Sequence, residues 1–204
     1  MSFYNWEHHW RRRFTHQSAF SGLTGLYWTN AIRDIGLALV NIFIPIYLYR
    51  QFGNISLVFI FLAVYHLSVV LSAYPVARVI RKIGLDYSGV LGGLLKVGFF
   101  ILLLASKTNP WLIWPAAWVW GLGVLFTWLV HHYYLAASSG RIHLFGQKVA
   151  TINLIDRWLL TLVPIAGGIM LDWGGFQLTF MVAAVFLGIS GLPLLFDKFN
   201  KKNM

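Results

Sequence analysis

Residues 111–130 read WLIWPAAWVWGLGVLFTWLV, an unbroken run without a charged side chain. A helix rises about 1.5 Å per residue, so such a run is roughly 30 Å long, which matches the hydrocarbon core of a bilayer. Residues 176–196 form a second uncharged run of similar length. These two runs predict transmembrane helices and place the chain in a membrane.

Four more apolar stretches are long enough to cross a bilayer, at residues 28–49, 55–76, 86–105 and 149–171. Together the six stretches predict an all-α membrane protein, a six-transmembrane-helix bundle over residues 28–196. Residues 1–27 form an N-terminal segment and residues 197–204 a short tail. The composition agrees, because 58% hydrophobic and 11% charged residues leave little material for a separate soluble domain.

The basic residues predict the orientation of the chain. If the N-terminus is cytoplasmic, the outer loops hold only Arg50 and Lys107, and the cytoplasmic segments hold Arg11, Arg12, Arg13, Arg78, Arg81, Lys82, Arg141, Lys148, Lys198, Lys201 and Lys202. Positive residues favour the cytoplasmic side, so we expect a multi-pass protein of the cell inner (plasma) membrane with both termini in the cytoplasm. The net charge of +10 is then a topology feature, and we expect no nucleic-acid partner.

The N-terminal segment carries aromatic residues at helical spacing. Phe3, Trp6, Trp10 and Phe14 would share one face of a short helix, with three arginines beside it. Such a helix would lie on the membrane surface, held by aromatic burial and by anionic membrane lipids. A disordered basic tail is an equally good interpretation.

Ionisable residues inside the predicted helices are few, and each costs at least about 2.5 kcal/mol at the bilayer centre unless it is paired or hydrated. They are Arg33, Asp34, His66, Lys96, His131, His132, Asp156 and Arg157. Arg33 and Asp34 are adjacent and point in different directions on a helix, so we expect their ion pairs to form between helices. Lys96 lies near the middle of its helix, where snorkelling alone does not relieve its charge.

Proline and glycine indicate where the helices break and pack. Pro45 cannot donate a hydrogen bond to the carbonyl of Asn41, which makes Asn41 a candidate binding residue, with simple packing as the alternative. Pro164 interrupts the fifth helix in the same way. Gly167 and Gly168 would let helices approach closely.

The sequence does not favour an enzyme. It contains no cysteine, which removes disulfides and thiolate chemistry. Ser138, Ser139 and His143 fall in a polar loop, where they cannot form a serine protease site within the membrane. His131 and His132 diverge on one helix. We expect no catalytic residues, no cofactor and no metal.

Three segments resemble motifs of one transporter superfamily. Residues 41–49, NIFIPIYLY, resemble the end of the first helix in a bacterial branch of that superfamily. Residues 77–84, ARVIRKIG, are similar to its loop signature G-x-L-x-D-R-x-G-R-R, with Lys82 and Gly84 matching and Ala77 and Arg81 departing from it. Residues 164–168, PIAGG, resemble the P-x-x-G-G part of its antiporter signature. The chain thus resembles the N-terminal six-helix half of a major facilitator superfamily transporter.

This resemblance implies a secondary carrier with alternating access, or the N-terminal half of one, and a second six-helix half on the same or a separate chain. It implies two inverted three-helix repeats and a small-molecule or ion substrate. We expect the substrate site at Asn41, Tyr65, His66, Trp120 and Thr127. We expect a conformational latch at Arg81, Lys82, Gly84 and Asp156. The alternative is a non-transporting six-helix membrane scaffold or partner subunit.

Overall fold

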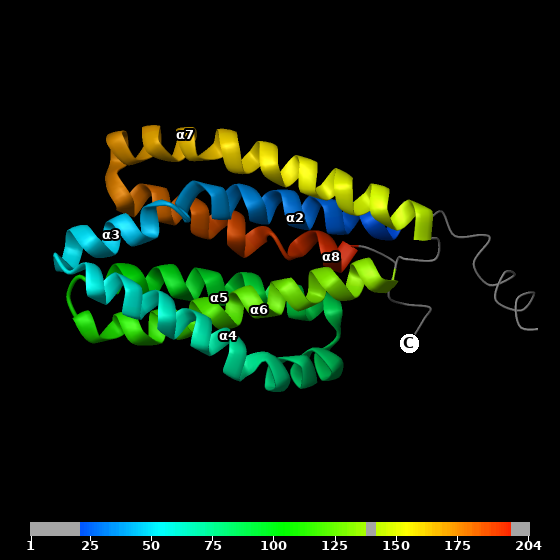
Figure 1. Ribbon diagram of the computed structural model, residues 1–204, viewed down its shortest axis with the longest axis horizontal. Helices are drawn as coiled ribbons and strands as arrows, with labels where there is room; N and C mark the ends of the chain where they lie inside the picture. Colours follow the sequence, from blue (N-terminus) through cyan, green and yellow to red (C-terminus); the bar gives the residue numbers. More distant parts are fainter. Residues whose placement is uncertain (1–20, 138–141, 197–204) are drawn as a thin grey trace, which may run out of the picture.

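The computed structural model describes residues 21–137 and 142–196, and in these ranges the chain is helical and contains no strand. Five of its helical stretches are long and apolar enough to cross a membrane. The helices lie side by side along one long axis (Figure 1). The predicted all-α membrane fold class is therefore confirmed. The expected surface helix at residues 3–14 and the tail at 197–204 lie outside the described residues.

The helices follow one another with short connections. Their bounds are α2 Ser21–Val40, α3 Phe43–Phe52, α4 Ile55–Ile83, α5 Leu85–Ala105, the 3₁₀ turn η1 Pro110–Leu112, α6 Ile113–Ala137, α7 Ile142–Ile189 and α8 Leu192–Phe196. The turn at Gly53 lies at one end of the bundle and the turn at Gly84 at the other (Figure 1). We call these the Gly53 end and the Gly84 end.

The first membrane crossing is interrupted at residues 41 and 42, between α2 and α3. The amide of Asn41 still donates to the carbonyl of Leu37 at 2.9 Å. Pro45 has no amide proton and cannot donate to the carbonyl of Asn41, and the helix is offset there.

Helix α4 is longer than the sequence suggested. Residues 77–83, which we expected in a loop, form its last turns. These residues are apolar or basic and none is a helix breaker. The helix ends at Gly84, which has φ 87° and ψ 163°, a backbone conformation that glycine reaches without steric cost.

Helix α7 contains a reversal. Gly175 has φ 68° and ψ −173° inside the 48-residue helix, and Figure 1 shows the ribbon turning back on itself in the orange region of α7. We call residues 142–174 the first arm of α7 and residues 176–189 its second arm. The long apolar stretch in this region runs from Asp156 to Phe196, and the predicted boundary between the fifth and sixth helices falls at the reversal.

Glycines set how closely α2 and the two arms of α7 approach. A Cβ added to Gly36 would lie 2.9 Å from Leu187 of the second arm. A Cβ added to Gly167 of the first arm would lie 2.8 Å from the carbonyl oxygen of Leu39. Helix α2 therefore packs against both arms, as helices do in membranes where small residues allow backbone approach.

Helix α6 packs against α4 and α5 in a similar way. A Cβ on Gly121 would meet Ser68 and the carbonyl of Tyr65, both on α4. A Cβ on Gly92 of α5 would lie 3.2 Å from the carbonyl of Gly123 on α6. Helix α5 also contacts the second arm of α7, because a Cβ on Gly93 would lie 2.6 Å from the carbonyl of Leu187.

The main core lies toward the Gly53 end and is rich in aromatic residues. The rings of Phe99 and Trp120 are 4.4 Å apart, and those of Phe100 and Phe180 are 5.4 Å apart. The buried hydroxyl of Tyr47 donates to the carbonyl of Leu103 at 3.3 Å. Most of the buried polar side chains lie outside this core, toward the Gly84 end.

Candidate functional site

A group of buried and half-buried polar side chains lies between the middle of the bundle and the Gly84 end. We call them the polar cluster: Thr29, Asn30, Arg33 and Asp34 on α2, Lys96 on α5, Thr127 and His131 on α6, and Asp156 on α7. The cluster joins four helices that come from distant parts of the sequence. Sequence reasoning found its ionisable members and Thr127, but not Thr29 or Asn30.

Arg33 and Asp34 form an ion pair within α2. Nε of Arg33 lies 2.9 Å from Oδ1 of Asp34, and Nη2 donates to Oδ2 at 3.2 Å. Our expectation that these neighbours would pair only between helices is wrong. The long arginine side chain curls back over the helix surface, and its planar fork matches the two carboxylate oxygens.

Asp156 connects this ion pair to α7. Its carboxyl group lies close to that of Asp34 across the interface of α2 and α7. The α2 and α7 interface thus holds two acidic side chains together with Arg33.

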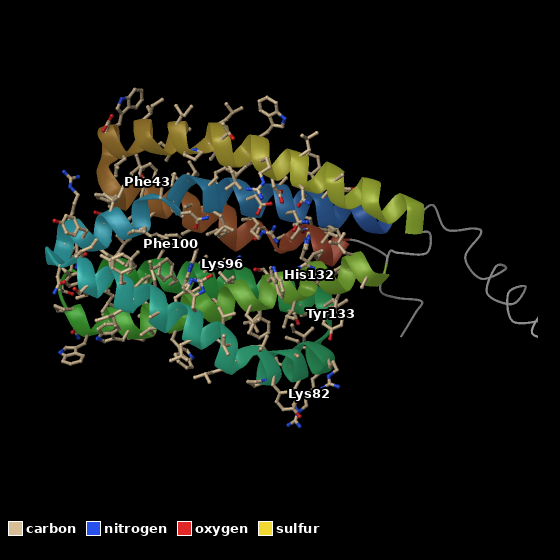
Figure 2. The ribbon with its side chains drawn as sticks, viewed as in Figure 1. Phe43, Lys82, Lys96, Phe100, His132 and Tyr133 are labelled. Atoms are coloured by element: carbon tan, nitrogen blue, oxygen red, sulfur yellow. The ribbon has the colours of Figure 1, made fainter. Side chains whose placement is uncertain are left out.

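Lys96 is the most deeply buried charged residue in the described part of the chain, with 1% of its surface exposed. Its Nζ donates to Oγ1 of Thr127 at 2.9 Å, and that hydroxyl lies 3.1 Å from the carbonyl of Gly123. Figure 2 shows Lys96 inside the bundle rather than reaching toward an end. A neutral hydroxyl is therefore its direct partner.

A small cavity adjoins the cluster. Its lining comes from α2, α5, α6 and the segment around α8: Leu26, Thr29, Asn30, Arg33, Gly89, Thr127, Val130, His131, Ser190 and Leu194. The space open to the centre of a water molecule is about 10 Å³, which is room for one water. The side chain of Asn30 contacts Nδ1 of His131 at 2.8 Å.

The hydroxyl of Thr29, which also lines this cavity, is buried and has no hydrogen-bond partner among the described residues. Buried hydroxyl groups normally have a partner, so one water in the cavity would satisfy it. The spacing of Asn30 and Asp34, one helical turn apart, was the available sequence clue to a polar face on α2.

Two predicted substrate-site residues lie on the surface of the bundle at similar depth. Asn41 is exposed 11 residues before the end of α3 at Phe52, and His66 is exposed 11 residues after the start of α4 at Ile55. At about 1.5 Å per residue, each lies roughly 16 Å from the Gly53 end. In a bilayer both would be near mid-depth.

The other predicted substrate residues are less accessible. Trp120 is 7% exposed and packs in the aromatic core. Thr127 is the partner of Lys96. Tyr65 is half-buried with its ring 4.4 Å from that of His66. The structure therefore brings Tyr65 and His66 together, and it keeps Trp120 and Thr127 in the interior.

The predicted latch residues are spread over two regions. Arg81 and Lys82 are exposed in the last turn of α4, and Gly84 ends that helix. Figure 2 shows Lys82 on the side of the bundle opposite α7, the helix that carries Asp156. Asp156 instead lies near Asp34, so the latch stays a prediction for another conformation.

The residues that we expected to shape helix packing lie in α3 and α7. Pro45 is in the first turn of α3, and Pro164 lies inside the first arm of α7. Gly167 faces α2, whereas a side chain at Gly168 would meet nothing within 4 Å. Among the described residues there is no group of three potential metal ligands of the His, Cys, Asp or Glu type.

These observations define the class of the protein: an all-α chain whose apolar helices are those of a membrane protein, with a buried polar cluster. No family model matches the chain, and no solved structure matches it. The chain is similar to the uncharacterized protein YqgE of Bacillus subtilis (strain 168), with 32% identity over 113 residues. That match covers 53% of this chain and 25% of the Bacillus protein. The chain thus matches about a quarter of the length of this relative.

Proposed function

We propose that this chain is a membrane transporter, a secondary carrier that moves a small solute by alternating access, or the N-terminal half of one. In this proposal the chain crosses the plasma membrane six times: once through α2 and α3, once each through α4, α5 and α6, and twice through the arms of α7. The Gly84 end is cytoplasmic, as the distribution of basic residues favours.

The observation that carries the proposal is the exposure of Asn41 and His66 at mid-depth. A polar or ionisable side chain that faces hydrocarbon is costly, and such residues normally face a protein partner or a water-filled passage. Asn41 also lies at a helix interruption, where free backbone groups are tolerated only if they line a cavity or meet another helix. A passage along this surface, closed by a second half, meets both requirements.

The packing pattern supports an internal repeat. Helix α2 packs against both arms of α7, α6 packs against α4 and α5, and α5 meets the second arm of α7. If the first three crossings are exchanged with the last three, the two contacts of α2 become the two contacts of α6, and the contact of α5 with the second arm of α7 is unchanged. This is the pattern expected of inverted three-helix repeats in a carrier.

The length of the Bacillus relative is compatible with a second half, because the matched part is only a quarter of that protein. We therefore propose that a second six-helix unit, on the same or a separate chain, completes the passage. Tyr65 would support cargo binding beside His66, and Trp120 and Thr127 would shape the wall behind them.

A six-helix scaffold or partner subunit is the second candidate. It is favoured by the close backbone contacts between α5 and α6 and by the small size of the described cavity. In that case Asn41 and His66 would be covered by a helix of another protein, and no water would reach them.

Thiol labelling distinguishes the two candidates, because the natural chain contains no cysteine. Asn41→Cys and His66→Cys, each in membranes of cells that make the completed assembly, should react with a small water-soluble thiol reagent, since thiolates form in water and not in hydrocarbon. Val185→Cys is the matched control, because Val185 is 61% exposed and lies near the middle of a predicted helix. It should stay unlabelled. Protection of Asn41→Cys and His66→Cys at the level of the control would reject the carrier and favour the scaffold.

A further inference from the structure

We propose that the outer face of α4 at the Gly84 end is a binding site for an anionic phospholipid. The site is a stripe of exposed residues that we call the α4 stripe: Leu67, Val70, Leu71, Tyr74, Arg78, Arg81 and Lys82. This inference does not depend on the proposed transport function, because it concerns the surface of one helix and the lipid around it.

The stripe occupies one face of the helix. Successive residues of an α-helix are rotated by about 100°, so the seven residues fall within a sector of roughly 120°. The buried residues of this part of α4, Ser68, Ser72, Val76 and Ile80, lie outside this sector, and the last three lie on the opposite face. The stripe therefore points away from the bundle, and Figure 2 shows Lys82 at its outer edge.

The order of side chains along the stripe matches the layers of a lipid. Leu67, Val70 and Leu71 are 51%, 71% and 59% exposed and would lie along an acyl chain. Tyr74 follows at 64% exposed, and tyrosine favours the level of the lipid headgroups. The three cations come last, within the final turns of the helix, where a phosphate would lie.

The cation nearest to Tyr74 is held in position by that residue. The guanidinium carbon of Arg78 lies 4.4 Å from the centre of the Tyr74 ring, and Nη2 of Arg78 donates to the Tyr74 hydroxyl. An arginine stacked on an aromatic ring keeps other N–H groups available for a phosphate. Lys82, one helical turn further along, adds a second charge on the same side of the helix.

The cations of the stripe form no ion pair with an acidic side chain of the described residues. Within the described residues the ion pair that forms is between Arg33 and Asp34, on another helix. The acidic residue that follows the stripe in sequence, Asp86, accepts a hydrogen bond from the Tyr134 hydroxyl. A ligand of negative charge would complement these cations, and anionic lipids are abundant at the membrane surface.

Native mass spectrometry of the purified 204-residue chain tests this site. The chain is titrated with phosphatidylglycerol and with phosphatidylcholine that carries the same acyl chains. Each cation near a membrane surface contributes about fivefold to anionic lipid binding, so the double variant Arg78→Gln with Lys82→Gln should bind phosphatidylglycerol about 30-fold more weakly. Binding of phosphatidylcholine should not change.

The matched control is the double variant Arg50→Gln with Lys107→Gln, which removes two exposed cations at the Gly53 end. It should bind phosphatidylglycerol as the natural chain does. An equal loss in the control would show attraction by net charge alone and would overturn the site. Unchanged binding in the Arg78 and Lys82 variant would also overturn it, as would full competition by glycerol phosphate, which lacks the acyl chains. Circular dichroism of each variant checks that the helices are intact.

Discussion

Helices α4 and α5 are neighbours in sequence and similar in hydropathy, yet they occupy different environments. Their most apolar windows have mean hydropathies of 2.3 and 2.0, but 22% of the α4 window is buried against 44% of the α5 window. Helix α5 contains Gly89, Gly92 and Gly93, which bring other backbones to it, whereas α4 has no glycine within its bounds. Apolarity thus determines that a helix enters the membrane, and small residues determine whether it packs inside the bundle.

The largest expected effect comes from adding one methyl group to α5. Gly93→Ala would place a Cβ 2.6 Å from the carbonyl oxygen of Leu187, and this backbone cannot move without separating α5 from α7. We expect a loss of about 3 kcal/mol in the free energy of unfolding, at the upper end of the range for overpacking. Thermal unfolding in detergent measures it.

Gly98→Ala is the matched control for this change. The same methyl group on the same helix would lie 3.9 Å from Val119, an ordinary contact. Both variants gain the same helix propensity, so their difference isolates the close approach. If Gly93→Ala is as stable as Gly98→Ala, the backbones of α5 and the second arm of α7 do not approach each other as closely as the structure shows.

The next largest effect compares leucine on the two helices. Leu103 of α5 is fully buried, whereas Leu71 of α4 is 59% exposed. Leu103→Ala should cost about 2 kcal/mol through lost packing, near the low end of the soluble range because lipid is as apolar as the core. Leu71→Ala should leave the unfolding free energy almost unchanged. Equal losses would mean that the α4 stripe is covered by protein.

Removing the buried charge of Lys96 should change the free energy of unfolding less, and in the opposite direction. Lys96→Met keeps the length of the side chain and removes an ammonium group whose direct partner is the hydroxyl of Thr127. Replacing a buried charge by an apolar group of similar volume is often neutral or stabilising, and we expect a gain of about 1 kcal/mol. The exposed lysine of α4 supplies the control, since Lys82→Met should change stability little. A large loss in Lys96→Met would show that the charge of Lys96 holds the polar cluster together.

The sequence predicts the features of the fold that neighbouring residues determine. Long apolar runs identify the membrane helices, and Pro45 marks the interruption near Asn41, because apolarity and the missing amide proton act within one stretch of chain. The turn near Gly175 is predicted for the same reason, since polar and glycine residues separate two apolar runs there. The six membrane crossings and the orientation of the chain in the membrane stay predictions.

The polar cluster could not be assembled from sequence. Its contacts depend on how each helix is rotated, as when Thr127 turns toward Lys96 rather than toward a passage. The pairing of Arg33 with the adjacent Asp34 depends on a side-chain conformation that residue spacing does not specify. Asn30 gains its role only through contact with His131, 101 residues away.

The smallest expected effect tests the exposed helix by removing one atom. Tyr74→Phe keeps the aromatic ring under the guanidinium of Arg78 and deletes the hydroxyl that accepts its hydrogen bond. An exposed hydrogen bond contributes little to folding, so the unfolding free energy should stay within about 0.5 kcal/mol of its original value. Affinity for phosphatidylglycerol should fall by about threefold, because Arg78 then spends part of its time in other rotamers and loses orientation. Tyr87→Phe, at another exposed tyrosine near the Gly84 end, is the control and should leave lipid affinity unchanged. If both variants bind equally, Tyr74 only fills the headgroup layer, and Arg78 acts as a mobile charge rather than as an oriented one.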